Sequence, residues 1–163
     1  MRRLFVAGIG IISLAGAAIG VGVTAASASP AVTKTEEFRL VTGSATSPTF
    51  GAIATGAFTA GGTFTPGNPG TASFPGGTFK VTDHVTKSTS HLNQTTCLYS
   101  QLAESTYQLS GGTGKYAGIK GSGTSMGQVL AVLSRNAKGK CSLSILPAAY
   151  QQIITAHGPI SGV

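Results

Sequence analysis

Acidic side chains are scarce in this 163-residue chain, and tryptophan is absent. Four Asp and Glu residues stand against eleven Lys and Arg, and charged residues of both signs make up only 9% of the sequence. General acid–base catalysis needs titratable groups held in position, and so few carboxylates leave little material for it. Together with the missing tryptophan, this scarcity favours a binding protein over an enzyme.

Cysteine is almost as rare, because Cys97 and Cys141 are the only two. None lies near the N-terminus, which excludes a lipoprotein anchor. An even number of cysteines in an exported chain predicts a disulfide. Closing a loop of this length stabilises a fold by about 4 kcal/mol in the chain-entropy model. The alternative is two free thiols with one acting as a nucleophile, but the local sequence offers no base.

Motifs for metal binding and nucleophilic catalysis are also missing. The spacing of His84, His91 and His157 matches no known ligand pattern, so we expect neither a metal nor another cofactor. No Gly-x-Ser-x-Gly elbow or Ser/His/Asp arrangement is present.

The N-terminus carries the features of a targeting segment. Arg2 and Arg3 precede an uncharged stretch over 4–23, and Ala26-Ser27-Ala28 supplies the small residues of a cleavage site. We predict a signal peptide over residues 1–28, export by the general secretory route, and a secreted product. Because the uncharged stretch is long enough to span a bilayer, the alternative is an uncleaved N-terminal anchor.

The remaining charge is basic but dispersed. Without Arg2 and Arg3, the eleven basic residues fall to nine against four acidic ones. Only Arg135, Lys138 and Lys140 cluster, beside a predicted turn over 136–139, and a solvated turn explains them better than a phosphate-binding patch. We therefore expect no nucleic-acid partner and no membrane contact in the mature form. Homo-oligomer formation stays open.

Apolar residues recur with a period of two, which is typical of strands. We expect a flexible segment over 29–35 and one β domain over 36–163. A single long strand is predicted over 50–64, where Phe, Ala and Gly keep one parity. Further strands are expected over 38–42, 78–86, 95–104, 107–110, 121–133, 141–145 and 150–156. Seven or eight short strands predict an all-β sandwich or an up-and-down barrel.

One glycine-rich run is distinctive: YQLSGGTGKYAGIKGSG over residues 107–123. A phosphate-cradling loop would need a helix directly after it, and residues 120–123 are a poor helix start. A tight turn between strands explains the run better, since glycine adopts positive φ without a steric penalty. Tyr116 can then plug one end of a barrel. The turn residues are Gly111, Gly112, Gly114, Tyr116, Gly118, Gly121 and Gly123.

This run resembles a segment of the allene oxide cyclase and dirigent-protein barrels. There a strand ends in Gly-Gly-Thr-Gly, a short turn carries an aromatic residue, and the next strand opens with Gly-x-Gly. Residues 74–79 and 151–160 resemble pieces of small secreted actinobacterial proteins of that barrel type. The resemblance covers most of residues 45–163. It implies an all-β fold, an eight-stranded antiparallel β-barrel of calycin-like type.

The resemblance does not carry catalytic residues, because the acidic and water-holding positions of the plant enzymes find no match here. We place Glu36 and Glu37 in the N-terminal tail or at the start of the first strand. That leaves Asp83 and Glu104 as the only acids for the interior. Asp83 shares the parity of Phe79 and so faces inward, unless the strand end there is already wet.

Three functions are compatible with these observations. The first is a non-catalytic extracellular barrel that binds a small hydrophobic ligand or a surface partner, with Phe79, Asp83 and Glu104 as ligand contacts. The second is an isomerase or cyclase that guides a reactive hydrophobic substrate, with Asp83 and Glu104 as candidate catalytic residues. The third is a structural envelope protein.

Overall fold

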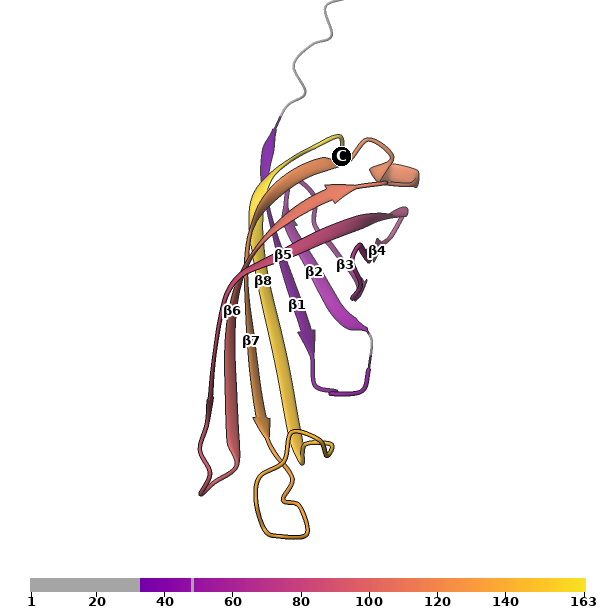
Figure 1. The fold of residues 1–163 in the computed structure, drawn as a ribbon. Coiled ribbons are helices and arrows are strands. Elements are labelled where there is room, and N and C mark those ends of the chain that lie inside the picture. Colours follow the sequence, from indigo (N-terminus) through magenta and orange to yellow (C-terminus); the bar gives the residue numbers. More distant parts are fainter. Residues whose placement is uncertain (1–32, 48) are drawn as a thin grey trace, which may run out of the picture.

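The computed structural model describes residues 33–47 and 49–163, so the expected signal peptide over 1–28 lies outside the described residues. It is an eight-stranded barrel in which every strand is antiparallel to the next, and β1 pairs with β8 to close the ring (Figure 1). The strands are β1 (Lys34–Thr42), β2 (Phe50–Gly56), β3 (Ala60–Thr65), β4 (Gly70–Phe74), β5 (Gly77–Leu92), β6 (Leu98–Ser110), β7 (Lys120–Val132) and β8 (Ala149–Ser161).

The predicted antiparallel barrel is confirmed, in its up-and-down form. Strand order around the ring follows sequence order, so each strand connects to its neighbour without a crossover. Closure gives every strand hydrogen-bonded partners on both sides over part of its length, whereas β5 beyond Val81 pairs with β6 alone. β1 begins at Lys34, two residues before the expected domain boundary.

The core lies inside the ring and follows the strand alternation. Along β1, Glu36, Phe38, Leu40 and Thr42 are buried while the residues between them are exposed. The other strands supply the rest of the inner wall. The buried hydrophobic members of this core are Phe38, Leu40, Phe50, Ala52, Ala54, Ala72, Phe74, Phe79, Tyr107, Leu109, Tyr116, Ile119, Ala156 and Ile160.

One half of the barrel is much taller than the other. β5 to β8 have 13 to 16 residues each, whereas β2, β3 and β4 have 7, 6 and 5. The long strands therefore project beyond the short ones as a curved sheet (Figure 1). A second small core at the projecting end groups Cys97, Ala131 and Leu133 with Leu92, Tyr99, Cys141 and Tyr150.

Two predictions about strand extents are wrong. The single strand expected over 50–64 is a hairpin of β2 and β3, with Ala54 opposite Ala60. Residues paired across an antiparallel ladder face the same side of the sheet. The inward-facing residues of β3 therefore continue the alternation of those in β2, and the turn between the two strands leaves no break in the sequence pattern. Conversely, the two strands expected over 95–104 and 107–110 are the single strand β6.

Two further strands differ from expectation. β5 runs on to Leu92, past the predicted end at Thr86, and its register with β6 shifts between Val85 and Lys87. The extra residue at this bulge reverses the parity of everything after it. The strand predicted over 141–145 is absent: an isolated bridge pairs Arg135 with Cys141, and the chain then forms a loop.

The predicted disulfide is confirmed, because Cys97 and Cys141 are bonded with their Cα atoms 5.3 Å apart. The bond ties the β5–β6 turn to the loop between β7 and β8. Within residues 33–47 and 49–163, no helix has the length and apolar character to cross a bilayer.

The glycine turn has the tight geometry that its sequence predicts. Gly111 and Gly114 have φ of 59° and 57°, and a Cβ on Gly112 would collide with the carbonyl oxygen of Tyr116. A short 3₁₀ helix, Gly114–Tyr116, follows, and it places the Tyr116 ring in the core with 3% of its surface exposed. Tyr116 therefore closes this end of the barrel, as predicted.

Candidate functional site

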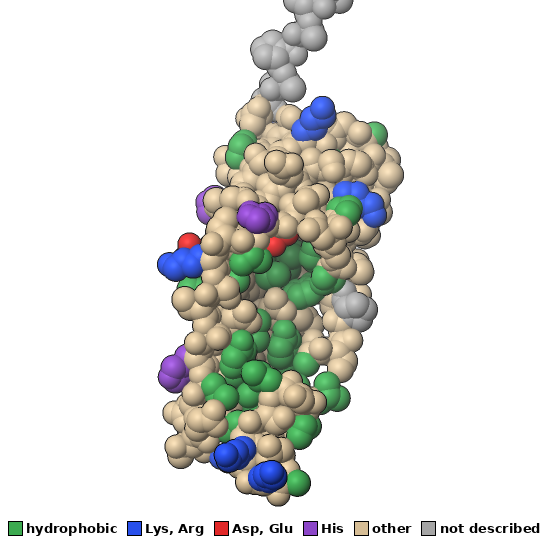
Figure 2. Space-filling model, viewed as in Figure 1, with side chains coloured by type: hydrophobic (Ala, Val, Ile, Leu, Met, Phe, Trp, Pro, Cys, Tyr) green, Lys and Arg blue, Asp and Glu red, His purple; other side chains and the backbone are tan. Residues whose placement is uncertain are grey.

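An apolar cavity of about 260 Å³ occupies the barrel interior. It extends from Tyr107 and Phe79 toward Val85 and Gly127, which is the direction in which the long strands project. Figure 2 shows apolar side chains gathered in a hollow on this face of the molecule. The lining residues are Phe38, Leu40, Phe50, Phe64, Pro66, Gly67, Ala72, Phe74, Phe79, Val81, Asp83, Val85, Ala103, Ser105, Tyr107, Leu109, Ser125, Gly127, Ile154 and Ala156.

The opposite end is sealed by aromatic rings. Tyr116 contacts Phe58, Phe74 and Phe79 with ring centroids 5.1 to 6.3 Å apart, and Phe38 packs on the same group. Such tilted and edge-to-face contacts stabilise a packed aromatic cluster beyond simple burial. The cavity is thus a pocket with one open end, and it is not a channel.

Glu36 is the most deeply buried ionisable side chain among the described residues. It projects inward from β1 with none of its surface exposed. The backbone N–H of Phe58 donates to its Oε2 at 3.1 Å, while Oε1 has no hydrogen-bond partner. Burial raises the pKa of Glu36, and the neighbouring backbone amides of Phe58, Ala57 and Thr55 oppose this less strongly. The carboxyl is therefore harder to ionise than an exposed one.

Tyr107 carries the second buried polar atom without a hydrogen-bond partner, its hydroxyl, and unlike Glu36 it lines the cavity. The residue is 4% exposed. Burial, and to a lesser degree the charge of Glu36, raise the pKa of Tyr107 to about 12. The phenol therefore keeps its proton and remains a hydrogen-bond donor, although its buried oxygen has no surface open to the cavity.

Two glycines make room for this pair. Tyr107 on β6 pairs with Gly123 on β7, and Gly158 on β8 pairs with Glu36 on β1. A Cβ on Gly123 would lie 2.8 Å from the Tyr107 hydroxyl and 2.9 Å from the Gly158 Cα. Any larger residue would push the phenol away. The Gly-x-Gly of the sequence motif thus shapes the interior as well as the turn.

Asp83 lines the cavity, as the strand alternation predicts, but it lies at the solvent-exposed rim. Its side chain is exposed, and the Ser125 hydroxyl donates to its Oδ1 at 3.5 Å. Asp83 pairs with Tyr107 in the β5–β6 ladder. The alternative expectation, in which the strand end at Asp83 is already in contact with solvent, is therefore the one that holds. Phe79, by contrast, lies deep in the cavity wall, with 1% of its surface exposed.

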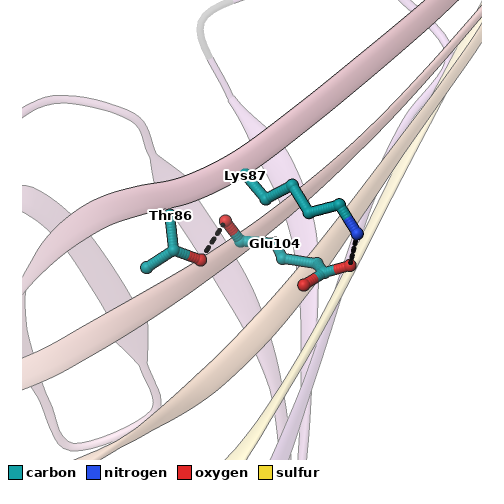
Figure 3. Close-up of polar contacts among 3 residues, drawn as sticks. All are labelled: Thr86, Lys87 and Glu104. Carbon is teal, nitrogen blue, oxygen red and sulfur yellow. Dashed lines mark hydrogen bonds and ion pairs between the residues drawn. The ribbon is translucent and has the colours of Figure 1, made fainter.

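The prediction that Glu104 serves the interior is wrong. Its neighbours Ala103 and Ser105 line the cavity, so the alternation of β6 turns Glu104 outward. There its Oε1 lies 3.4 Å from the Nζ of Lys87, and its carbonyl accepts a hydrogen bond from Thr86 at 3.0 Å (Figure 3). The Lys87 side chain is exposed and the Glu104 side chain is about half exposed, so the pair contributes little to stability.

Glu36 is the functional candidate that sequence reasoning missed. The sequence pattern that could have placed it inside is the strand alternation, because Glu36 stands two residues before Phe38 and four before Leu40. The neighbouring Glu37 obscured that signal, since two adjacent acids look like a solvated strand start. The structure separates them: Glu36 is fully buried and Glu37 is exposed.

The chemistry open to this site is limited and specific. Across the described ranges, no three His, Cys, Asp or Glu side chains are grouped to hold a metal ion. The cavity presents a largely apolar wall that includes the ring of Tyr107, whose buried hydroxyl has no partner, and the Glu36 carboxyl lies outside this lining. Such a site can bind an apolar molecule.

Comparisons with known proteins give no match. No protein-family model matches the chain. No curated protein and no solved structure is similar to it at a significant level.

Proposed function

We propose that this protein binds a small hydrophobic ligand in its barrel cavity, with the Tyr107 hydroxyl donating a hydrogen bond to a polar atom at the inner end of that ligand. The supporting observation is the cavity itself: its wall is apolar apart from Tyr107, Ser105, and the rim residues Asp83 and Ser125. Its volume of about 260 Å³ lies just below the range for ligand pockets, about 300–1,000 Å³.

The unpartnered hydroxyl favours a ligand with one polar atom over a pure hydrocarbon, provided that the Tyr107 ring turns to bring this buried oxygen to the lumen. A buried donor without an acceptor costs about 1–3 kcal/mol, and a bound acceptor would recover that free energy. The ligand class we infer is therefore a small apolar molecule with a single carbonyl, ether or hydroxyl oxygen.

A second candidate function is the isomerase or cyclase activity that the resemblance to allene oxide cyclase and dirigent barrels suggests. Glu36 favours it, because a fully buried carboxyl with one unpartnered oxygen is costly to keep for stability alone. In this version Tyr107 contacts the substrate, and Glu36 acts through Tyr107 as a positioning residue. Membership of that family is part of the proposal.

Export is part of the proposal too. A signal peptide over 1–28 would deliver the chain to an oxidising compartment, where the Cys97–Cys141 disulfide forms readily. The ligand would then be an extracellular one.

Ligand binding can be tested with the uncharged fluorophore N-phenyl-1-naphthylamine and the variant Gly127→Val. Gly127 lines the cavity, and a Cβ there meets only the Ile154 side chain at 3.6 Å, so valine fits the strand but fills the lumen. We expect the protein to enhance the probe's emission and Gly127→Val to lose at least tenfold in affinity for it. Native mass spectrometry of protein purified from its own culture medium would then reveal a retained ligand.

The matched control is Gly61→Val, because a Cβ on Gly61 has nothing within 4 Å and the residue lies on the exposed face of β3. Both variants put valine into a strand. Equal probe binding by the two variants would overturn the cavity as the binding site.

The two candidate functions separate at Tyr107→Phe and Glu36→Gln. If the protein only binds, Tyr107→Phe lowers the affinity for the natural ligand, and Glu36→Gln changes that affinity little. If it catalyses, both variants lower the rate at which a retained substrate is converted, while probe binding persists. Conversion that survives both changes would exclude a role for this pair.

A further inference from the structure

The loop between β7 and β8, residues 133–148, carries the most exposed apolar side chains of the described chain. Leu143 and Leu146 are 68% and 63% exposed, and Ile145 between them is 43% exposed. Together they form a short apolar tip at the projecting end of the barrel. Clustered exposed apolar residues of this kind mark an interaction site more often than isolated ones do.

The same loop carries three basic residues and no acidic one. Arg135, Lys138 and Lys140 are exposed, and residues 105–163 contain no acidic residue at all. The Arg135 guanidinium donates to the carbonyls of Gly139 and Thr95, both at 2.7 Å. Lys138 and Lys140 have no side-chain partner within the part of the chain that the structure describes. Two unpaired ammonium groups therefore lie in the same loop as the apolar tip.

Covalent and hydrogen bonds hold this loop in place. The disulfide from Cys141 fixes its middle to the β5–β6 turn. The Asn136 side chain accepts from the backbone N–H groups of Lys138 and Lys140, and the Ser134 hydroxyl donates to the carbonyl of Leu146 at 2.6 Å. The apolar and basic groups are thus presented together on a fixed frame, which lowers the ordering cost of docking.

Against the sequence-based expectation of a solvated turn without membrane contact, we propose that this loop docks the protein onto an anionic phospholipid surface, with Leu143, Ile145 and Leu146 entering the interface and Lys138 and Lys140 contacting the headgroups. Apolar side chains flanked by lysines are what such a surface recognises, since burial and charge attraction add. Charge complementarity favours this partner over a second copy, which would bring the same cations together.

This docking would also orient the cavity. The loop lies at the end toward which the cavity opens, and Figure 2 shows basic and apolar side chains side by side at that end. The lumen would then face the lipid. Docking does not depend on the proposed ligand, so a failure of one proposal leaves the other standing.

The absence of tryptophan gives a local test. Leu143→Trp in the full chain creates the only tryptophan, so its emission reports on this loop and not on the N-terminal apolar stretch. We expect a blue shift with vesicles of equal phosphatidylglycerol and phosphatidylcholine, and none with phosphatidylcholine alone. Adding Lys138→Gln or Lys140→Gln should weaken vesicle binding about fivefold each, and Leu146→Ser at least about tenfold.

The matched control is Ile53→Trp, on the outer wall of β2, where the parent residue is 53% exposed. Its emission should not respond to vesicles. The proposal is overturned if Leu143→Trp shows no shift, if neutral and anionic vesicles act alike, or if both tryptophans respond equally. A blue shift that rises with protein concentration without vesicles would overturn it in favour of a second copy.

Discussion

The hydroxyl of Tyr107 lies over Gly123, near enough to Glu36 for that carboxylate to raise the pKa of the phenol. Each of the two groups keeps a buried polar atom without a hydrogen-bond partner. They stand on opposite sides of two adjacent glycines, Gly123 and Gly158, on neighbouring strands. This arrangement places two buried, unpartnered polar atoms close to the wall of a largely apolar cavity.

Glu36→Gln should stabilise the protein at neutral pH by about 1 kcal/mol, because it removes a buried charge and keeps the shape. Burial raises the pKa of Glu36 above its ordinary 4.5, so the folded state holds this proton more tightly than the unfolded state. The parent therefore loses stability as pH rises from about 4.5 through the folded pKa, and the variant does not. Urea unfolding at pH 4 and pH 8 measures the difference.

The neighbouring variant Glu37→Gln is the control, since Glu37 is exposed on the same strand. It should change stability by less than about 0.5 kcal/mol at either pH. If Glu36→Gln destabilises the protein at pH 8, the carboxylate is stabilised by contacts that the structure does not show.

Tyr107 should be the last of the four tyrosines to ionise. Its pKa is raised to about 12, mainly by burial and secondarily by Glu36. NMR of the protein labelled with ¹³C at tyrosine Cζ should show one resonance that titrates last, and Tyr107→Phe should remove it. Glu36→Gln should lower the pKa of Tyr107, though not to 10, because burial remains. An unchanged value would disprove their electrostatic coupling.

Loss of the disulfide should cost about 4 kcal/mol, since it closes a loop with a sequence separation of 44. Cys97→Ser, Cys141→Ser and the double variant should lower the free energy of unfolding to a similar extent, because each removes the same bond. Urea denaturation with the intact mass before and after reduction checks this. Alkylation of both thiols in the parent without reductant would refute the bond.

The glycine turn can be tested with a pair of positive-φ glycines. Gly114 has φ 57° and a Cβ there would collide with the carbonyl oxygen of Gly76, whereas Gly139 has φ 73° and open space. Gly139→Ala should therefore cost about 1–2 kcal/mol, the strain of the left-handed backbone alone. Gly114→Ala should cost clearly more, and Gly114→Val should prevent folding. Equal thermal stability of the two alanine variants would show that the collision is relieved.

The sequence by itself determined the fold class, the disulfide and the glycine turn. Alternation between apolar and polar residues, punctuated by glycine and proline, is a local property of each strand, and it needs no partner strand to be read. The two cysteines allowed only one intrachain pairing. Tyr116 could be placed as a plug because the glycines around it already required a tight turn.

Only the tertiary structure decided which acids reach the interior. The bulge at Thr86, the turn hidden within residues 50–64 and the outward side of Glu104 all depend on register between strands, which local sequence does not encode. Glu36 became a site residue because ring closure brings β1 beside β8 and, across two glycines, within range of Tyr107. Burial and charge at that point are set by residues up to 122 positions away in the chain.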